Sequence, residues 1–69
     1  MSHANIRATI LPDIIRLISE SYSISEEEAL DQFYTSATGA NFANDEIGLY
    51  GQSPLYIFGL FLIEKGDEK

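Results

Sequence analysis

The sequence predicts a small all-α protein, a bundle of helices joined by short connections. Three observations predict this class. Apolar residues repeat at helical spacing in the first third of the chain, a serine–glutamate capping pattern follows, and helix-start and helix-stop signals frame the most apolar stretch. The pattern indicates three main helices, over about 6–22, 26–37 and 54–65, and a short helix near 45–50.

The first expected helix rests on apolar residues at every fourth position. They are Ile10, Ile14, Ile18 and Tyr22. Pro12 conflicts with a helix interior, because proline removes a backbone donor and is tolerated mainly in a first turn. The periodic segment therefore predicts a helix over about 6–22, and Pro12 leaves open a later start near Thr9 or Leu11.

The second expected helix begins with a capping box. Ser25 is followed three residues later by Glu28, so each side chain can bond a backbone amide at the helix start. An apolar stripe through Ala29 and Phe33 continues to about residue 37, and Gly39 is the expected cap. The run of glutamates at 26–28 suits capping and the helix dipole better than an acid–base or metal cluster.

A short helix is expected over about 45–50. Asn44, Asp45 and Glu46 resemble a helix start, and glycines at 48 and 51 keep the element short. The same residues carry oxygen ligands, but their spacing does not match a calcium loop. We therefore expect no metal ion here.

The most apolar stretch, 53–63, predicts the last helix. Ser53 and Pro54 form a start signal, and Gly66 after Lys65 forms a stop signal. The aromatic and β-branched residues between them leave a strand as the alternative, which the two caps disfavour. The run is shorter than the roughly 20 residues that span a bilayer, so we expect a core or interface helix.

A helix that is apolar nearly all round needs cover on nearly every side. The last helix therefore predicts an interface, and Gly59 in its middle has two interpretations: a weak point, or a place where another backbone approaches closely. The candidate interface residues are Leu55, Phe58, Gly59, Phe61 and Leu62.

The length of 69 residues predicts one domain, 1–69, with loose ends at 1–5 and 66–69. A domain this small is marginally stable alone, and oligomerisation or a partner chain is the expected support. The chain has no cysteine, and its only histidine is His3, so neither a disulfide nor a zinc site is expected.

The net charge of −7, from 11 acidic and 4 basic residues, disfavours nucleic acid and anionic membranes as partners. The charge either keeps the chain in solution or steers it toward a basic partner. Near the expected helix starts it forms a candidate acidic surface of Glu26, Glu27, Asp45 and Glu46.

The chain resembles a bacterial family of short helical proteins known as domain of unknown function 3791, over residues 10–64. The resemblance rests on core and capping positions, and the spacing between Phe33 and Tyr56 is similar to that in the family. The matching positions are Ile24, Ser25, Glu28, Ala29, Phe33, Tyr56 and Ile57. It implies the same helical plan. Genes of this family often lie beside genes for larger proteins, some resembling ADP-ribosyltransferase toxins, so the resemblance also implies an antitoxin-like or accessory partner.

The function expected from these observations is a small, acidic protein–protein interaction module, cytoplasmic, that forms a homodimer or binds another protein. The alternatives are a small DNA-associated regulator, which Arg7 and Arg16 alone support poorly, and a purely structural homo-oligomer. Catalysis is not expected, because tyrosines 34, 50 and 56 lack a partner base or metal set. No cofactor and no secretory signal is expected.

Overall fold

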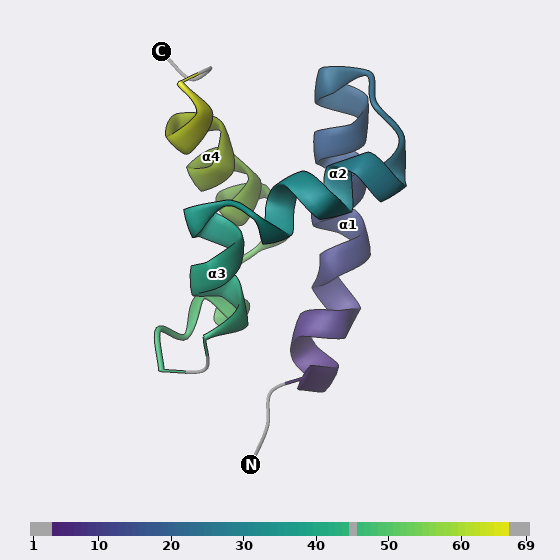
Figure 1. Ribbon diagram of the computed structural model, residues 1–69. Coiled ribbons are helices and arrows are strands. Elements are labelled where there is room, and N and C mark those ends of the chain that lie inside the picture. Colours follow the sequence, from purple (N-terminus) through teal and green to yellow (C-terminus); the bar gives the residue numbers. More distant parts are fainter. Residues whose placement is uncertain (1–3, 45, 67–69) are drawn as a thin grey trace.

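The computed structural model describes residues 4–44 and 46–66, and every regular element in those ranges is helical (Figure 1). The expected small all-α bundle is therefore confirmed. The elements are α1 (Ala4–Tyr22), α2 (Glu26–Tyr34), α3 (Ala37–Ala43), the 3₁₀ turn η1 (Leu49–Gly51) and α4 (Pro54–Lys65). Figure 1 shows α2 crossing α1, with α3 and α4 to the left of this pair.

Helix α1 starts earlier than the sequence suggests, and Pro12 lies inside it. Ala4 and Asn5 are helical, which corrects the expected loose start at 1–5 and the later start near Thr9; residues 1–3 lie outside the described part. Pro12 removes only its own N–H from the helical ladder. Burial of Ile14 and Ile18, both fully enclosed, holds the helix on the core past this defect.

Helix α1 is connected to α2 by a tight turn that contains no glycine. Ser23 adopts a left-handed backbone with φ 58°, and the N–H of Ile24 donates to the carbonyl of Ser19 at 3.0 Å. This bond closes the last turn of α1 as a Schellman motif does. Ile24 then packs against the core, so the turn fixes where α2 begins.

Helix α2 begins where the capping pattern places it, because the Ser25 hydroxyl accepts the N–H of Glu28 at 3.1 Å. It ends at Tyr34 instead of near 37, and a new helix starts at Ala37. Gly39, expected as a helix end, lies in the first turn of this new helix α3. Its N–H donates to the Ser36 hydroxyl at 2.9 Å, so a second serine cap starts a helix over Ala37–Ala43 that the sequence pattern did not predict.

The short helix expected over 45–50 is a 3₁₀ turn at Leu49–Gly51. Gly48 has a left-handed backbone with φ 73°, which an α-helix cannot continue through, and this explains the later and shorter element. Asp45 lies outside the described residues. Helix α4 spans Pro54–Lys65 as expected. The Ser53 hydroxyl caps its start, and Gly66 with φ 80° ends it, whereas residues 67–69 lie outside the described part.

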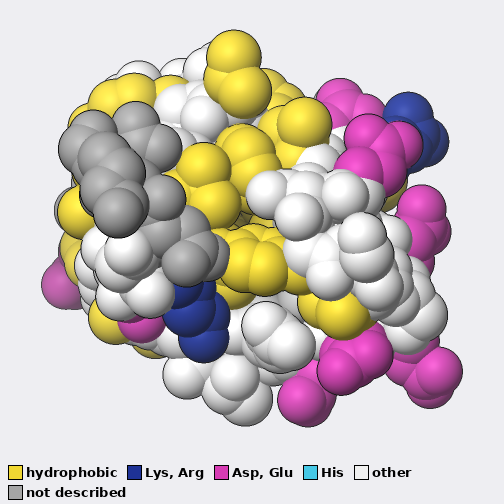
Figure 2. Space-filling view, turned by 90° about the horizontal axis from the view of Figure 1, so that it is seen from above, with side chains coloured by type: hydrophobic (Ala, Val, Ile, Leu, Met, Phe, Trp, Pro, Cys, Tyr) yellow, Lys and Arg dark blue, Asp and Glu magenta, His cyan; other side chains and the backbone are white. Residues whose placement is uncertain are grey.

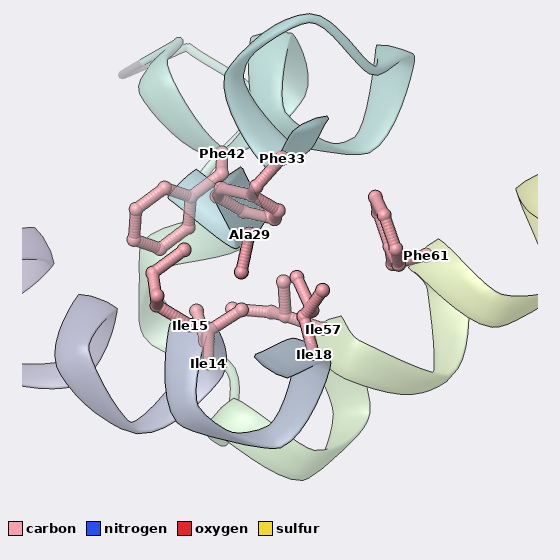
Figure 3. Packing of buried hydrophobic residues seen from close by; sticks show 8 residues of the cluster. All are labelled: Ile14, Ile15, Ile18, Ala29, Phe33, Phe42, Ile57 and Phe61. Atoms are coloured by element: carbon pink, nitrogen blue, oxygen red, sulfur yellow. The ribbon is translucent and has the colours of Figure 1, made fainter. Parts of the chain in front are cut away.

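The core combines aliphatic side chains, most of them from α1, with one or more side chains from each of the other helices, including three phenylalanine rings (Figure 3). Its buried members are Ile14, Ile15, Ile18, Ala29, Phe33, Phe42, Ile57 and Phe61. Phe33 of α2 lies at the aromatic centre, with its ring centroid 5.6 Å from that of Phe42 and 6.2 Å from that of Phe61. Each helix therefore contributes at least one side chain to a single core.

Candidate functional site

Helix α4 turns only one side toward the core. Ile57 and Phe61, four residues apart, are both fully buried, and Tyr22 packs edge-on against Phe61 with ring centroids 6.1 Å apart. Because residues four apart share one side of a helix, Ile57 and Phe61 define the side that faces the core, and residues on the opposite side of α4 face outward. The apolar sequence of α4 therefore places large apolar side chains in water.

We define the outer face of α4 as Leu55, Tyr56, Gly59, Leu62 and Ile63. Leu55 is 67 % exposed, Tyr56 52 % and Ile63 61 %, whereas Gly59 and Leu62 are partly buried. Exposed apolar residues that adjoin one another mark interfaces more often than isolated ones do. This face is thus the first candidate site.

Of the five candidate interface residues from sequence, Phe61 has to be reassigned, because it belongs to the core of its own chain. Phe58 is half-buried and packs against that core. Leu55, Gly59 and Leu62 lie on the outer face of α4, where their role in an interface stays a prediction. Helical periodicity could have separated the two groups, since Ile57 and Phe61 share one side of the helix.

Gly59 lies at the middle of the outer face, with open space beside it. Apart from its chain neighbours and the adjoining backbone of α4, no atom of the described residues lies within 4 Å of a Cβ placed on Gly59. The close approach of another backbone that the sequence left open therefore does not occur within the described part of the chain.

The end of α4 is tied to the start of α3 by Glu64. Its carboxylate accepts the N–H of Ala37 at 2.7 Å, and both the N–H and the hydroxyl of Thr38, at 2.9 and 2.7 Å. Together with the Ser36 cap, these contacts satisfy the first three free amides of α3. We call this arrangement the Glu64 clamp.

The hydrogen bonds of the Glu64 clamp also lower the pKa of the Glu64 carboxyl group. The hydroxyl of Thr38, followed by the backbone amides of Ala37 and Thr38, lowers the pKa of Glu64 below its usual value of 4.5. Hydrogen bonds donated to a carboxylate favour its charged form, which is the physical reason for the direction. Nothing in the sequence near Glu64 indicates this role, because its partners lie 26 and 27 positions away.

The second candidate site is a groove between α1 and the first turns of α2, with a volume of about 380 Å³. We call it the α1–α2 groove. It is lined by Leu11, Pro12, Ile15, Glu26, Glu27 and Leu30. The groove combines an apolar floor with two carboxylates. The sequence indicated the two glutamates as a candidate surface, but it did not indicate that apolar residues of α1 and α2 form a groove beside them.

The acidic surface expected from the sequence is divided between elements. Glu26 and Glu27 are exposed in the first turn of α2, and Glu46 is exposed in the connection after α3, whereas Asp45 lies outside the described residues. Figure 2 shows acidic side chains gathered mainly on the α1–α2 side of one face of the molecule, and apolar ones toward α4 and across the centre. On this face, charged and apolar side chains are thus largely separated.

Further observations concern the exposure of the tyrosines, possible metal ligands and the hydrophobicity of the helices. Tyr34 and Tyr56 are about half exposed at the surface, and the side chain of Tyr50 is outside the described set. Within 4–44 and 46–66, no three histidine, cysteine or acidic side chains come together as a metal site would require. No helix in this part of the chain has the length and apolar character needed to cross a membrane.

Comparison of the chain with protein-family models, with curated proteins and with solved structures found no match. The resemblance to the domain of unknown function 3791 family therefore stays a prediction from sequence. The candidate functions rest on the two surfaces and their chemistry.

Proposed function

We propose that this chain is a small protein–protein interaction module that pairs with a second copy of itself through the outer face of α4. The observation that carries the proposal is the exposure of Leu55, Tyr56 and Ile63 on a single helix. Each large apolar side chain left in water forgoes roughly 1.5–3 kcal/mol, and covering such side chains is the usual driving force of association. Three of the six exposed large apolar side chains among the described residues lie on this one helix.

The arrangement of the outer face suits a two-fold axis through Gly59. Leu55 and Ile63 lie four residues before and four residues after this glycine. In an antiparallel pair of α4 helices, each Leu55 would therefore meet the Ile63 of the other copy. The bare backbone at Gly59 would let the two helices approach closely at their crossing point.

Electrostatics also favour α4 as the place where two copies meet. Two chains of net charge −7 repel each other, but residues 53–63 contain no charged side chain. The Glu64 carboxylate is neutralised in part by the amides of α3 and neighbours Lys65. Pairing through α4 keeps the acidic side of α1 and α2 away from the contact and free for a further partner.

This arrangement supports the accessory or antitoxin-like role that the family resemblance implies. A dimer held by α4 would present two copies of the acidic α1–α2 surface to a basic protein. We propose a cytoplasmic setting for this interaction, in keeping with a chain that has no cysteine.

The test is the solution mass over a dilution series, measured by sedimentation equilibrium. Wild-type protein should approach twice the chain mass of 7.7 kDa, with a dissociation constant on the order of 10 µM because the apolar face is small. Ile63→Lys should raise this constant at least about tenfold by placing a charge in the contact. Ile47→Lys is the matched control, since Ile47 is 51 % exposed and lies in the connection after α3.

A wild-type chain that stays monomeric up to about 500 µM would contradict the pairing. Equal effects of Ile63→Lys and Ile47→Lys would contradict the assignment to α4. In both cases circular dichroism establishes that the variants keep their helices, which is expected because both side chains point into water.

A further inference from the structure

The α1–α2 groove offers recognition chemistry that self-association through α4 does not use. Its floor is formed by Leu11, Ile15 and Leu30, of which Ile15 is almost completely buried and Leu30 is 37 % exposed. Its volume of about 380 Å³ lies at the small end of ligand sites, which suits one or two large side chains and not a whole helix.

The rim of the groove is negatively charged. Glu26 and Glu27 line the groove from the first turn of α2, and both side chains are exposed. Partial positive charge at the helix start stabilises these carboxylates in place. A ligand that enters between α1 and α2 therefore meets two acidic groups beside an apolar floor.

The groove thus offers an apolar floor with negative charge beside it. A complementary ligand must bring an apolar side chain and positive charge.

From this combination we propose that the α1–α2 groove binds a short segment of a partner protein in which a large apolar side chain adjoins lysine or arginine. The apolar side chain covers Leu11, Ile15 and Leu30, and the cation lies against Glu26 and Glu27. Charge complementarity identifies the occupant as a basic segment, because this acidic chain disfavours acidic ones. The site lies on α1 and α2 and is separate from the outer face of α4.

The test is an NMR titration of ¹⁵N-labelled protein with three synthetic peptides on a glycine–serine background. The first carries one leucine between two lysines, the second replaces the leucine by serine, and the third replaces the lysines by glutamates. The first peptide should produce saturable shifts at Leu11, Ile15 and Leu30. The serine and glutamate peptides should bind at least about fivefold more weakly.

Two double variants of equal net charge distinguish binding at the groove from nonspecific electrostatic attraction. Glu26→Gln with Glu27→Gln should weaken binding of the first peptide about fivefold. Glu20→Gln with Glu46→Gln removes the same charge from exposed positions outside the groove and should leave the affinity within about twofold.

Equal weakening by both double variants would overturn the proposal, since net charge alone would then explain binding. Equal binding of the leucine and serine peptides would overturn it as well, because the apolar floor would have no part. The titration is repeated on Ile63→Lys. If the first peptide still binds this variant, the groove binds independently of pairing through α4. This conclusion holds whether or not the pairing itself is confirmed.

Discussion

At the scale of single residues, two glycines in helices have opposite surroundings. A Cβ on Gly39 would lie 1.8 Å from the carbonyl oxygen of Phe33, well inside contact distance, whereas a Cβ on Gly59 meets nothing within 4 Å. Gly39 therefore permits the end of α2 and the start of α3 to touch. Gly59 serves no packing purpose inside the chain.

These surroundings predict opposite effects of the same substitution. Gly39→Ala should lower the free energy of unfolding by about 3 kcal/mol, because backbone atoms of α2 must move to admit the methyl group. Gly59→Ala, the matched control, should raise it by about 0.5–1 kcal/mol through better helix propensity when the protein is measured well below the dissociation constant of the pair, so that the contact at Gly59 has no part. Urea unfolding followed by circular dichroism measures both, and a tolerated Gly39→Ala would contradict the close contact.

The two glycines also show how far single residues can be interpreted from sequence. Gly39 was expected as a helix end, but its hydrogen bond to Ser36 places it at a helix start. A glycine in a sequence can mark a left-handed turn, a close contact between backbones, or neither. Only the residues around it in the folded structure show which of these applies. Gly66 could be assigned correctly because the preceding apolar run and Lys65 already marked the end of α4.

At the scale of elements, the start of α3 shows what sequence-based prediction missed. Ser25 and Ser53 cap α2 and α4 as their neighbouring residues indicate. Ser36 caps α3 in the same way, but Gly39 three residues later indicates a helix end, and the other first-turn amides of α3 bond Glu64, 26 and 27 positions away. The sequence therefore suggested a helix end near residue 37 and no helix over Ala37–Ala43, and the Glu64 clamp was missed.

The Glu64 clamp should make stability depend on pH. The folded-state pKa of Glu64 lies below its usual 4.5, because the Thr38 hydroxyl and the amides of Ala37 and Thr38 bond the carboxylate. Its contribution is therefore fully present above pH 4.5 and is lost as the pH falls through the lowered folded-state value. Glu64→Gln should cost about 1 kcal/mol at pH 7 and almost nothing in strong acid.

The measurement is urea unfolding of wild type and Glu64→Gln between pH 7 and pH 2. The difference between the two proteins isolates Glu64, since every other acidic group is common to both. Glu46→Gln, an exposed acid in the connection after α3, is the control and should leave the pH profile parallel to that of wild type. A difference that stays constant with pH would contradict a charged clamp.

At the scale of the whole molecule, excess negative charge opposes the compact state. The chain carries a net charge of −7 on 69 residues. Exposed acids lie close in sequence on α1 and α2, at positions Glu20, Glu26, Glu27, Glu28 and Asp31. The composition predicted this charge, but the separation of charged and apolar surfaces seen in Figure 2 depends on how the helices pack. Folding brings these charges together, so their mutual repulsion should weaken the folded state.

Salt should therefore stabilise this protein. Raising sodium chloride from about 10 to about 300 mM shortens the Debye length to well under 10 Å, which screens exposed charges from one another. We expect the free energy of unfolding to rise by about 0.5 kcal/mol, or the melting temperature by about 2–4 °C, in a calorimetric series. Glu20→Gln combined with Asp31→Asn removes two of these charges and should flatten that increase. Because the repulsion acts within one chain, the effect must persist in Ile63→Lys, in which pairing through α4 is weakened. A salt effect confined to the wild-type chain would instead mean that salt acts by promoting association.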